Sequence, residues 1–364
     1  MWETHPSSWE AADVTVDIRQ VAAAAGVSTA TVSRVLSGRG PASAEARRKV
    51  HSAARRLHYL PNASASSLRT DRSMIIGVLV PNLGNPVYLP FLRAVEQTTQ
   101  AYGYSVIVAD TGRSPETERH QLDRLAAQRT DALIMAGRPA NPEHIRRLGR
   151  SGLPVVDPIT LGSELGQDAA GAGREAVIEA CRHIASLEHQ ALAFVVRGTA
   201  LQQTSRWRWD LIRATCELLG IETSLVTLGN VPWPDVAGAP TMAGTLAELL
   251  EGTSRRSQVL DGTSRRPTVL WSSSHVLAPQ LLESLATIGM DLPSDCSFLT
   301  FGDSPWASAY RPPISVVTGD LAAVAILMTR TVLHRLGVIR DAPDPNLPPD
   351  SYRPRRSVGP APGS

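Results

Sequence analysis

The feature that most constrains the fold is a regular alternation of apolar and helix-like segments, which starts at Met74 and continues to about residue 340. The apolar segments are short and rich in aliphatic residues, such as MIIGVLV at 74–80 and ALAFVV at 191–196. Strands that alternate with helices form βαβ units and therefore parallel sheets. The stretch is too long for one small sheet. We predict a body of two doubly wound α/β lobes, with a ligand cleft at the carboxyl ends of the strands.

Before Met74 the pattern changes to short amphipathic helices, which lie within residues 15–61. Asp17 and Gln20 have the spacing of a capping box, which satisfies free N–H groups at the start of a helix. Gly26 ends that helix, because glycine readily takes the left-handed conformation found at helix ends, and Ser28 then caps a second helix. Two short helices joined by a tight glycine turn predict an all-α helix-turn-helix head, whose second helix enters the major groove of DNA.

The distribution of charge supports a DNA-binding head. Residues 1–72 carry ten of the 36 Lys and Arg residues but only six of the 34 Asp and Glu residues. A small basic head on a near-neutral chain is typical of a module that binds a polyanion. Arg34 is the side chain best suited to a guanine edge, and the Ser28 hydroxyl is suited to a phosphate. A three-helix bundle whose basic residues are merely solvated is the alternative.

The head also resembles a known protein family. The segment VAAAAGVSTATVSRVLSG at 21–38 is similar to the helix-turn-helix of the lac repressor family of bacterial transcription regulators. The likeness continues through YLPNASASSLRT at 59–70 and IGVLVPNLGNP at 76–86. The resemblance implies a regulator, in function a repressor, that binds a pseudo-palindromic double-stranded DNA operator as a homodimer and responds to a small-molecule effector. It also implies that the body is similar to periplasmic sugar-binding proteins.

Pattern and resemblance together give the expected domain organisation. The expected parts are a disordered lead-in at 1–14, the helix-turn-helix at 15–61, a hinge helix or linker at 62–73, an effector-binding and dimerisation domain at 74–340, and a proline-rich tail at 341–364. The two lobes are expected to meet near residues 172–174, with later crossovers. The tail lacks the leucine-rich helix through which members of the family form tetramers, and this favours a dimer.

The resemblance implies that the second helix and the hinge contact DNA. Ser28 and Thr31 are expected on phosphate and Arg34 on a base edge, while Leu68 is expected to wedge into the minor groove and kink the duplex. The family often has a threonine where this chain has Asp17, and a carboxylate cannot donate that hydrogen bond to a phosphate. The expected DNA contacts are Ser28, Thr29, Ala30, Thr31, Ser33, Arg34, Tyr59, Asn62, Ala65 and Leu68.

The resemblance also implies a set of effector contacts in the body. Tyr88 is expected to stack on a ligand ring, and Arg208 to clamp hydroxyl groups or a carboxylate. Where the family has an Asn–Asp pair that grips sugar hydroxyls, this chain has Ser274–His275, which argues against a simple sugar and favours a more apolar or aromatic ligand, or none. Core roles for the aromatic residues and a surface ion pair for Arg208 are the alternatives. The expected contacts are Asn85, Tyr88, Arg208, Trp271, Ser274 and Asp303.

Other classes of function find little support. Three widely spaced cysteines, Cys181, Cys216 and Cys296, do not suggest a disulfide framework or a zinc site. No phosphate loop, nucleophile elbow or HExxH motif is present, so we expect no enzyme, cofactor or metal. No membrane-length apolar run or signal-like start is present, so we expect a cytoplasmic protein. Two rivals remain: an effector-blind regulator whose body only dimerises, and a small-molecule-binding protein without a DNA function.

Overall fold

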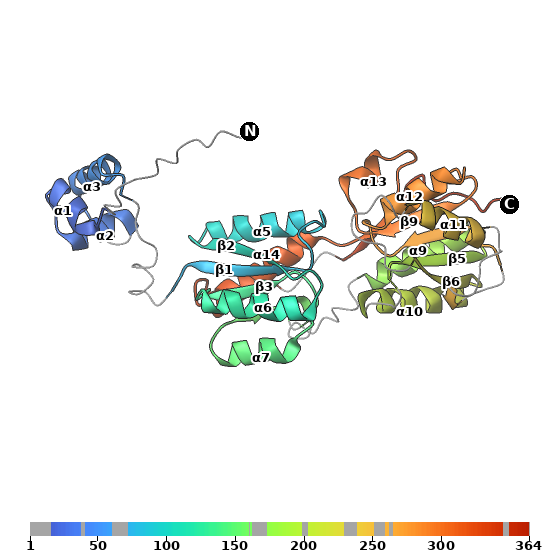
Figure 1. Cartoon of the computed structure of the whole chain (residues 1–364), viewed down its shortest axis with the longest axis horizontal. Helices are drawn as coiled ribbons and strands as arrows, with labels where there is room; N and C mark the ends of the chain where they lie inside the picture. The colour runs from blue at the N-terminus through green and yellow to red at the C-terminus, as the bar shows by residue number, and fades with distance from the viewer. Residues whose placement is uncertain are drawn as a thin grey trace, which may run out of the picture. The chain divides into compact units, whose positions relative to one another are not determined.

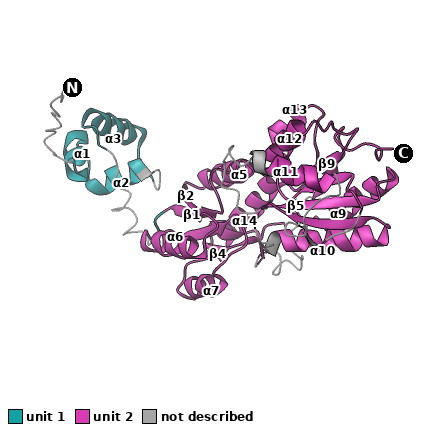
Figure 2. Ribbon diagram, turned by 45° about the vertical axis from the view of Figure 1, so that its right-hand side comes forward, with its two compact units in different colours: residues 1–73 teal, residues 74–364 magenta. Residues whose placement is uncertain are grey.

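The computed structural model divides the chain into two compact units, residues 1–73 and residues 74–364 (Figure 2). The residues that the structure describes are 16–37, 41–59, 72–159, 161, 173–198, 203–228, 239–250, 259–261, 265–344 and 349–363. The expected lead-in and the hinge positions Asn62, Ala65 and Leu68 lie outside the described residues.

Unit 1 contains three short helices (Figure 1). They are α1 (Ile18–Ala25), α2 (Thr29–Ser37) and α3 (Ala44–Arg56). The predicted capping box is confirmed, because Asp17 Oδ1 accepts from the backbone N–H of Gln20 at 2.9 Å and Gln20 Oε1 accepts from that of Asp17 at 2.8 Å. Gly26 follows α1 in the left-handed conformation, with φ of 66°. The start of the first helix and the glycine turn were therefore readable from the sequence.

A small apolar core holds the three helices together. One valine from each helix, Val21, Val32 and Val50, is fully buried, and alanines fill the space between them. Burial of a valine side chain contributes roughly 1.5–3 kcal/mol, and the small alanines let the helices approach closely. This core fixes which face of α2 points outward.

The first lobe of unit 2 is built on a four-stranded parallel sheet with the order β2–β1–β3–β4. The strands are β1 (Ile75–Val80), β2 (Ser105–Asp110), β3 (Ala132–Met135) and β4 (Val155–Val156). The helices that connect them are α5 (Tyr88–Gln100), α6 (Pro115–Ala127) and α7 (Pro142–Arg150). Ser114 caps α6 by accepting from the backbone N–H of Thr117.

The second lobe is built on a seven-stranded sheet with the order β11–β10–β9–β8–β5–β6–β7. Its strands are β5 (Ala191–Val196), β6 (Glu222–Thr227), β7 (Val259–Asp261), β8 (Val269–Ser272), β9 (Ser297–Phe301), β10 (Ser315–Thr318) and β11 (Ser351–Arg353). Its helices are α9 (Arg174–Ser186), α10 (Gln203–Leu218), α11 (Ala239–Leu250), α12 (Ala278–Thr287) and α13 (Pro305–Ala309). The central strands are parallel, as predicted, whereas β7 and β11 pair antiparallel at the two edges.

The chain returns to the first lobe after it has built most of the second. Helix α14 (Leu321–Arg335) follows β10 but packs against α5 and against β3 (Figure 1). Its buried side chains Met328, Val332 and Leu333 share one core with Ile76 and Phe91. The two lobes are therefore connected by more than one crossing of the chain.

The tail departs from the sequence expectation. We expected residues 341–364 to be extended or disordered, but Ser351–Arg353 forms β11, which pairs with β10. Tyr352 and Val358 are buried in the core of the second lobe. The proline count hid this strand, because the isolated apolar residues of the segment are few and only the second lobe supplies their partners.

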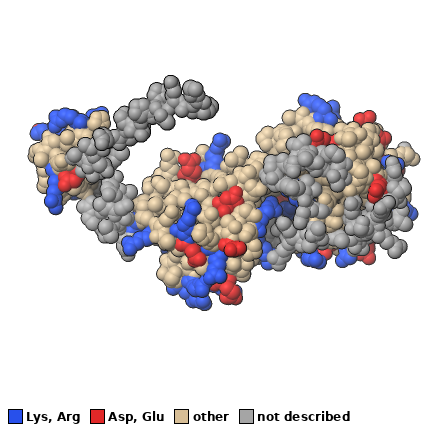
Figure 3. Space-filling view, viewed as in Figure 1, with Lys and Arg blue, Asp and Glu red and all other residues tan. Residues whose placement is uncertain are grey.

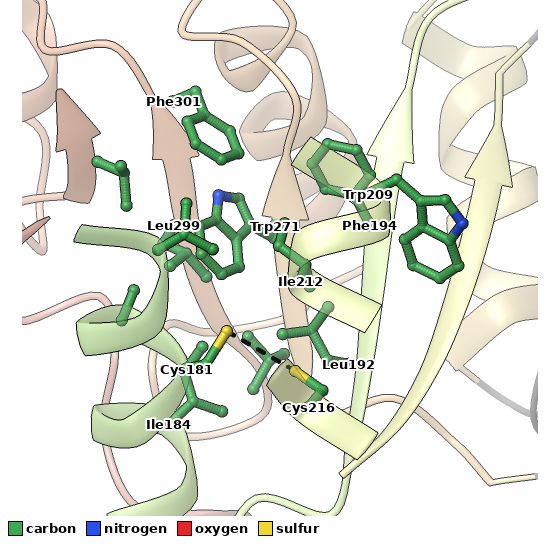
Figure 4. Packing of buried hydrophobic residues seen from close by; sticks show 14 of the residues in the cluster. Cys181, Ile184, Leu192, Phe194, Trp209, Ile212, Cys216, Trp271, Leu299 and Phe301 are labelled. Atoms are coloured by element: carbon green, nitrogen blue, oxygen red, sulfur yellow. Dashed lines mark hydrogen bonds between the residues drawn. The ribbon is translucent and has the colours of Figure 1, made fainter. Parts of the chain in front are cut away.

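The core of the second lobe is rich in aromatic residues (Figure 4). Trp271 on β8 is fully buried and stacks on Phe301 of β9, with ring centroids 5.2 Å apart. Phe194 of β5 stacks on Trp209 of α10. The thiols of Cys181 and Cys216 lie 3.8 Å apart as free, buried groups in the same core. Burial and their mutual contact raise the pKa of Cys181 far above its ordinary value, so this thiol stays protonated.

Two searches of the described residues gave no result. None of the helices there is both long enough and apolar enough to cross a bilayer. Within the same residues, no group of three His, Cys, Asp or Glu side chains is suitably arranged to hold a metal ion.

The first prediction concerns Tyr352. Its ring is buried and its hydroxyl lies 2.8 Å from His183 Nδ1. We expect Tyr352→Ala to lower the free energy of unfolding by about 3 kcal/mol, as for other buried aromatic truncations, and Tyr352→Phe by about 1 kcal/mol, the value of one hydrogen bond. Urea denaturation followed by tryptophan fluorescence measures both. Equal stability of Tyr352→Ala and the wild type would show that β11 is not an integral part of the lobe.

Candidate functional site

The start of helix α2 is organised by Ser28. Its Oγ accepts from the backbone N–H of Thr31 at 3.2 Å and lies 3.0 Å from the Thr31 hydroxyl. Its carbonyl oxygen accepts from the N–H groups of Thr31 and Val32. Remaining N–H groups at a helix start attract anions such as a phosphate. Ser28 and Thr31 therefore lie together, in the arrangement expected of a phosphate contact.

The outer face of α2 carries the other predicted DNA contacts. Thr29, Ala30 and Arg34 are exposed, and Ser33 is half-buried. Arg34 Nε donates to the carbonyl oxygen of Ala30 at 3.2 Å, so the guanidinium lies back along the helix surface. Because the side chains at the first positions are small, Arg34 is the longest hydrogen-bond donor on this face. The assignment of these residues to DNA stays a prediction.

Tyr59 is the last described residue before the expected hinge. Its backbone N–H donates to the carbonyl oxygen of Ala54 at 2.9 Å, and its half-buried ring packs against the core of unit 1. It also lines a surface hollow whose other members sequence reasoning did not single out. They are Arg47, Arg48, His51, Ala54, Arg55 and His58. The spacing of residues 47, 51 and 55 on one helix face was the available signal.

In unit 2 the two lobes meet at the carboxyl ends of their strands. Asn85 follows β1 and His275 follows β8, and the Asn85 Oδ1 atom lies 2.8 Å from His275 Nε2. A carboxamide oxygen only accepts, so the imidazole donates. Both side chains are buried. Gly302, with φ of 86°, lies against the ring, where a Cβ atom would come within 2.5 Å of His275 Nδ1.

Arg208 projects from α10 into the same region. Its Nη1 donates to the carbonyl oxygen of Ser273 at 3.1 Å, and its guanidinium lies 4.1 Å above the centroid of the Phe301 ring. Burial lowers the pKa of Arg208 to about 10, against the opposing effect of Asp350 and Tyr88. The guanidinium keeps its proton at neutral pH, because a pKa of about 10 is still well above pH 7.

Two further arginines contribute charge to this region. Arg113 lies beyond the end of β2, and Arg197 lies directly after β5. Burial lowers the pKa of Arg197, and the charge of Arg113 lowers it further. Burial raises the pKa of Tyr88, which both Arg113 and Arg208 oppose. These mutual influences require the three guanidinium groups and Tyr88 to lie near one another.

His275 stays neutral in this surrounding. Burial lowers its pKa to about 4, a hydrogen bond to the backbone of Phe301 acts in the opposite direction, and the charges of Arg208 and Arg113 lower it further. We use the name interlobe site for Asn85, Tyr88, Arg113, Arg197, Arg208 and His275. Figure 3 shows basic side chains at the junction of the two lobes.

The remaining predicted effector residues have structural partners. Asp303 is paired with Arg355, whose Nη2 lies 2.7 Å from Oδ2, and with Arg353 at 3.0 Å. Ser274 Oγ accepts from the backbone N–H of Leu277. Trp271 is fully buried, and its Nε1–H has no hydrogen-bond partner among the described residues. An unsatisfied buried donor of this kind costs about 1–3 kcal/mol.

Sequence reasoning therefore found part of the site. Asn85, Tyr88 and Arg208 come together as expected, although their contact with an effector stays a prediction. Arg113 and Arg197 were missed as candidates. The signal for them was their position just beyond the carboxyl end of a parallel strand, where ligands of open α/β sheets bind.

Three family models match the chain. Residues 17–62 match the bacterial regulatory proteins of the lacI family. Residues 73–190 match the periplasmic binding proteins and sugar binding domain of the LacI family, and residues 181–358 match the periplasmic binding protein-like domain. Together these matches span almost the whole described chain.

Curated relatives and solved structures agree. The chain is 27% identical to catabolite control protein A of Streptococcus mutans over 89% of this chain and 93% of that protein. The corresponding protein of Priestia megaterium is 24% identical over 88% and 93%. The fold is similar to that of the lac repressor dimer bound to operator and the anti-inducer ONPF, with a TM-score of 0.73, 21% identity and coverage of 94% and 99%. A LacI-family regulator from Silicibacter pomeroyi gives a TM-score of 0.71 at 22% identity, with the same coverage.

The second prediction follows from the neutral His275. Its pKa of about 4 in the folded chain is below the 6.5 of an ordinary histidine, so on acidification the unfolded chain takes up its proton first. The contribution to stability is therefore complete above pH 6.5 and is lost as the pH falls towards 4. Between pH 7 and pH 5 we expect the wild type to lose about 2 kcal/mol more stability than His275→Asn.

Urea denaturation of both proteins at the two pH values measures this difference. The variant serves as its own control, because every other titrating group is shared. An equal loss of stability in the two proteins would contradict the neutral state of His275.

Proposed function

The chain belongs to the lacI family of bacterial regulatory proteins and is a DNA-binding transcriptional regulator, and we propose that it represses its targets from a pseudo-palindromic operator. It binds the operator as a homodimer, with half-sites about one helical turn apart. A small molecule bound at the interlobe site changes its affinity for DNA. The protein acts in the cytoplasm and has no catalytic role.

The observation that carries this proposal is the outer face of α2. The helix is short and held by the valine core, so its exposed side chains keep a fixed orientation. Its start is organised by Ser28 and Thr31, while Arg34 extends from the same helix. These features supply a phosphate anchor and a base-reading donor, the two kinds of contact that a helix-turn-helix needs.

The hinge contributes by resemblance. Leu68 is proposed as the wedge in the minor groove, and Asn62 and Ala65 as neighbouring contacts, all outside the described residues. A segment rich in alanine and serine buries too little surface to fold alone, so ordering on DNA suits it. Folding of the hinge would then depend on the spacing of two copies, which couples DNA binding to the arrangement of the dimer.

The effector role is supported by the chemistry of the interlobe site. A half-buried guanidinium, a neutral buried imidazole and a half-buried tyrosine come from both lobes. Clusters of perturbed titratable groups at strand ends are typical of binding sites. Among the structural relatives, the lac repressor was solved with the small molecules ONPF and ONPG, and a Lactobacillus casei regulator with bound glucose. The interlobe site favours an effector-responsive regulator over one whose body only dimerises.

The third prediction compares two arginines of unit 1. We expect Arg34→Ala to lose about 1–3 kcal/mol of operator affinity per half-site and to relax selectivity at one base position. Arg56→Ala is the matched control, because Arg56 is an exposed arginine of α3 that does not line the basic hollow. It should weaken binding slightly and equally on all sequences.

Fluorescence anisotropy on operator and scrambled duplexes at several salt concentrations measures both variants. Equal effects of the two substitutions on operator and scrambled DNA would contradict base reading by Arg34.

The fourth prediction tests the function as a whole. Fragments of the source genome are selected with the purified full-length protein, in parallel with Leu68→Ala. We expect the wild type to recover a palindrome with a flexible central step, and we expect Leu68→Ala to lose that enrichment. Absence of enrichment by the wild type at low and at moderate salt would contradict a DNA-binding regulator that acts without a corepressor.

A further inference from the structure

We propose that the interlobe site binds a small phosphate monoester, whose dianionic group is held by Arg113, Arg197 and Arg208. This inference rests on the proposed effector role of the site and names the chemical class of the effector. It departs from the sequence expectation of an apolar or aromatic ligand.

The three arginines come from separate elements but converge on one region. Arg113 belongs to the loop after β2 in the first lobe, Arg197 to the end of β5, and Arg208 to α10 in the second lobe. Each of the three influences the titration of a neighbour in this region, as Tyr88 and His275 each sense both Arg113 and Arg208. Like charges are brought together at a cost, which an anion bound between them would offset.

The local balance of charge matches a dianion. Asp350 is the carboxylate whose charge acts on Arg208, but no described carboxylate lies within ion-pair distance of Arg208. Asp303, the other nearby acid, is already paired with Arg355 and Arg353. Three guanidinium groups against one carboxylate leave about two positive charges, the complement of a phosphate monoester.

The hydrogen-bonding groups of the region are mostly donors. Guanidinium groups donate only, and His275 Nε2 already donates to Asn85. The buried Trp271 Nε1–H has no partner among the described residues, and Figure 4 shows this nitrogen turned towards the Phe301 end of the cluster. A neutral sugar needs acceptors as well as donors, whereas the oxygens of a phosphate only accept. The donor-rich composition therefore selects an oxyanion over a polyol.

Arg208 is positioned to make a directed contact. Its guanidinium is fixed by the Ser273 carbonyl oxygen and by the Phe301 ring, so it loses little freedom when it binds. A planar guanidinium held in this way presents its free N–H groups as a fork that fits a phosphate. Arg113 is exposed on its loop and completes the site from the opposite lobe.

The test is isothermal titration calorimetry of the full-length protein with matched ligand pairs. The pairs are ribose phosphate with ribose and glycerol phosphate with glycerol, and inorganic phosphate is titrated alone. We expect each monoester to bind at least about tenfold more tightly than its neutral parent, since a charge-assisted hydrogen bond is worth that much. Binding of the monoesters above binding of inorganic phosphate distinguishes an organic ligand from a free anion.

Three variants locate the binding. Arg208→Gln and Arg113→Asn should each weaken monoester binding at least about tenfold. Asparagine is chosen because Arg113 has φ of 59°, a conformation that asparagine tolerates. Arg206→Gln, which removes an exposed arginine from the same helix as Arg208, should leave binding unchanged. Circular dichroism checks that each variant is folded.

Several outcomes would overturn the proposal. These are equal binding of the neutral parents, no binding of any phosphate compound, unchanged binding in both Arg208→Gln and Arg113→Asn, or monoester binding that leaves operator affinity unaltered. Operator binding by the wild type without ligand is measured separately. Its absence, with monoester binding intact, would remove the proposed DNA function but keep the anion site.

Discussion

The body depends on one constraint, which is that parallel strands bring all their carboxyl ends to one edge of a sheet. Loops that are far apart in sequence must therefore share a small volume. Asn85 after β1 and His275 after β8 meet there in a hydrogen bond of 2.8 Å that joins the two lobes. The imidazole is neutral because it is buried beside Arg208 and Arg113. The junction of the lobes is thus also the place where positive charge collects.

This charge gives a physical meaning to the departures from the family pattern. The chain has Ser274–His275 where the family has an Asn–Asp pair, so two side-chain acceptors are missing from the second lobe. Asp303, which keeps its carboxylate, uses it in ion pairs with Arg355 and Arg353. Substitution of acceptors by donors at one strand edge changes the preferred ligand from a polyol to an anion, without any change of fold.

Local signals made much of the fold predictable. The Asp17–Gln20 capping box, the turn at Gly26 and the β/α alternation each depend on neighbours in sequence. The strand around Tyr352 was not predicted, because its stabilising partners lie on β10 and α9 and its own flanks are rich in proline. Arg113 and Arg197 were missed for a related reason. An arginine after a strand looks solvated in sequence, and only the tertiary fold brings several together.

The same geometry suggests how a ligand could act on the rest of the chain. An effector shifts an equilibrium only by the difference in its affinity for two arrangements. Arg113 belongs to the first lobe, whereas Arg197 and Arg208 belong to the second, so without an anion these charges repel across the junction. A dianion between them replaces that repulsion by attraction and favours closed lobes over open ones. Because α14 crosses back to pack on α5, a change between the lobes also reaches the core of the first lobe.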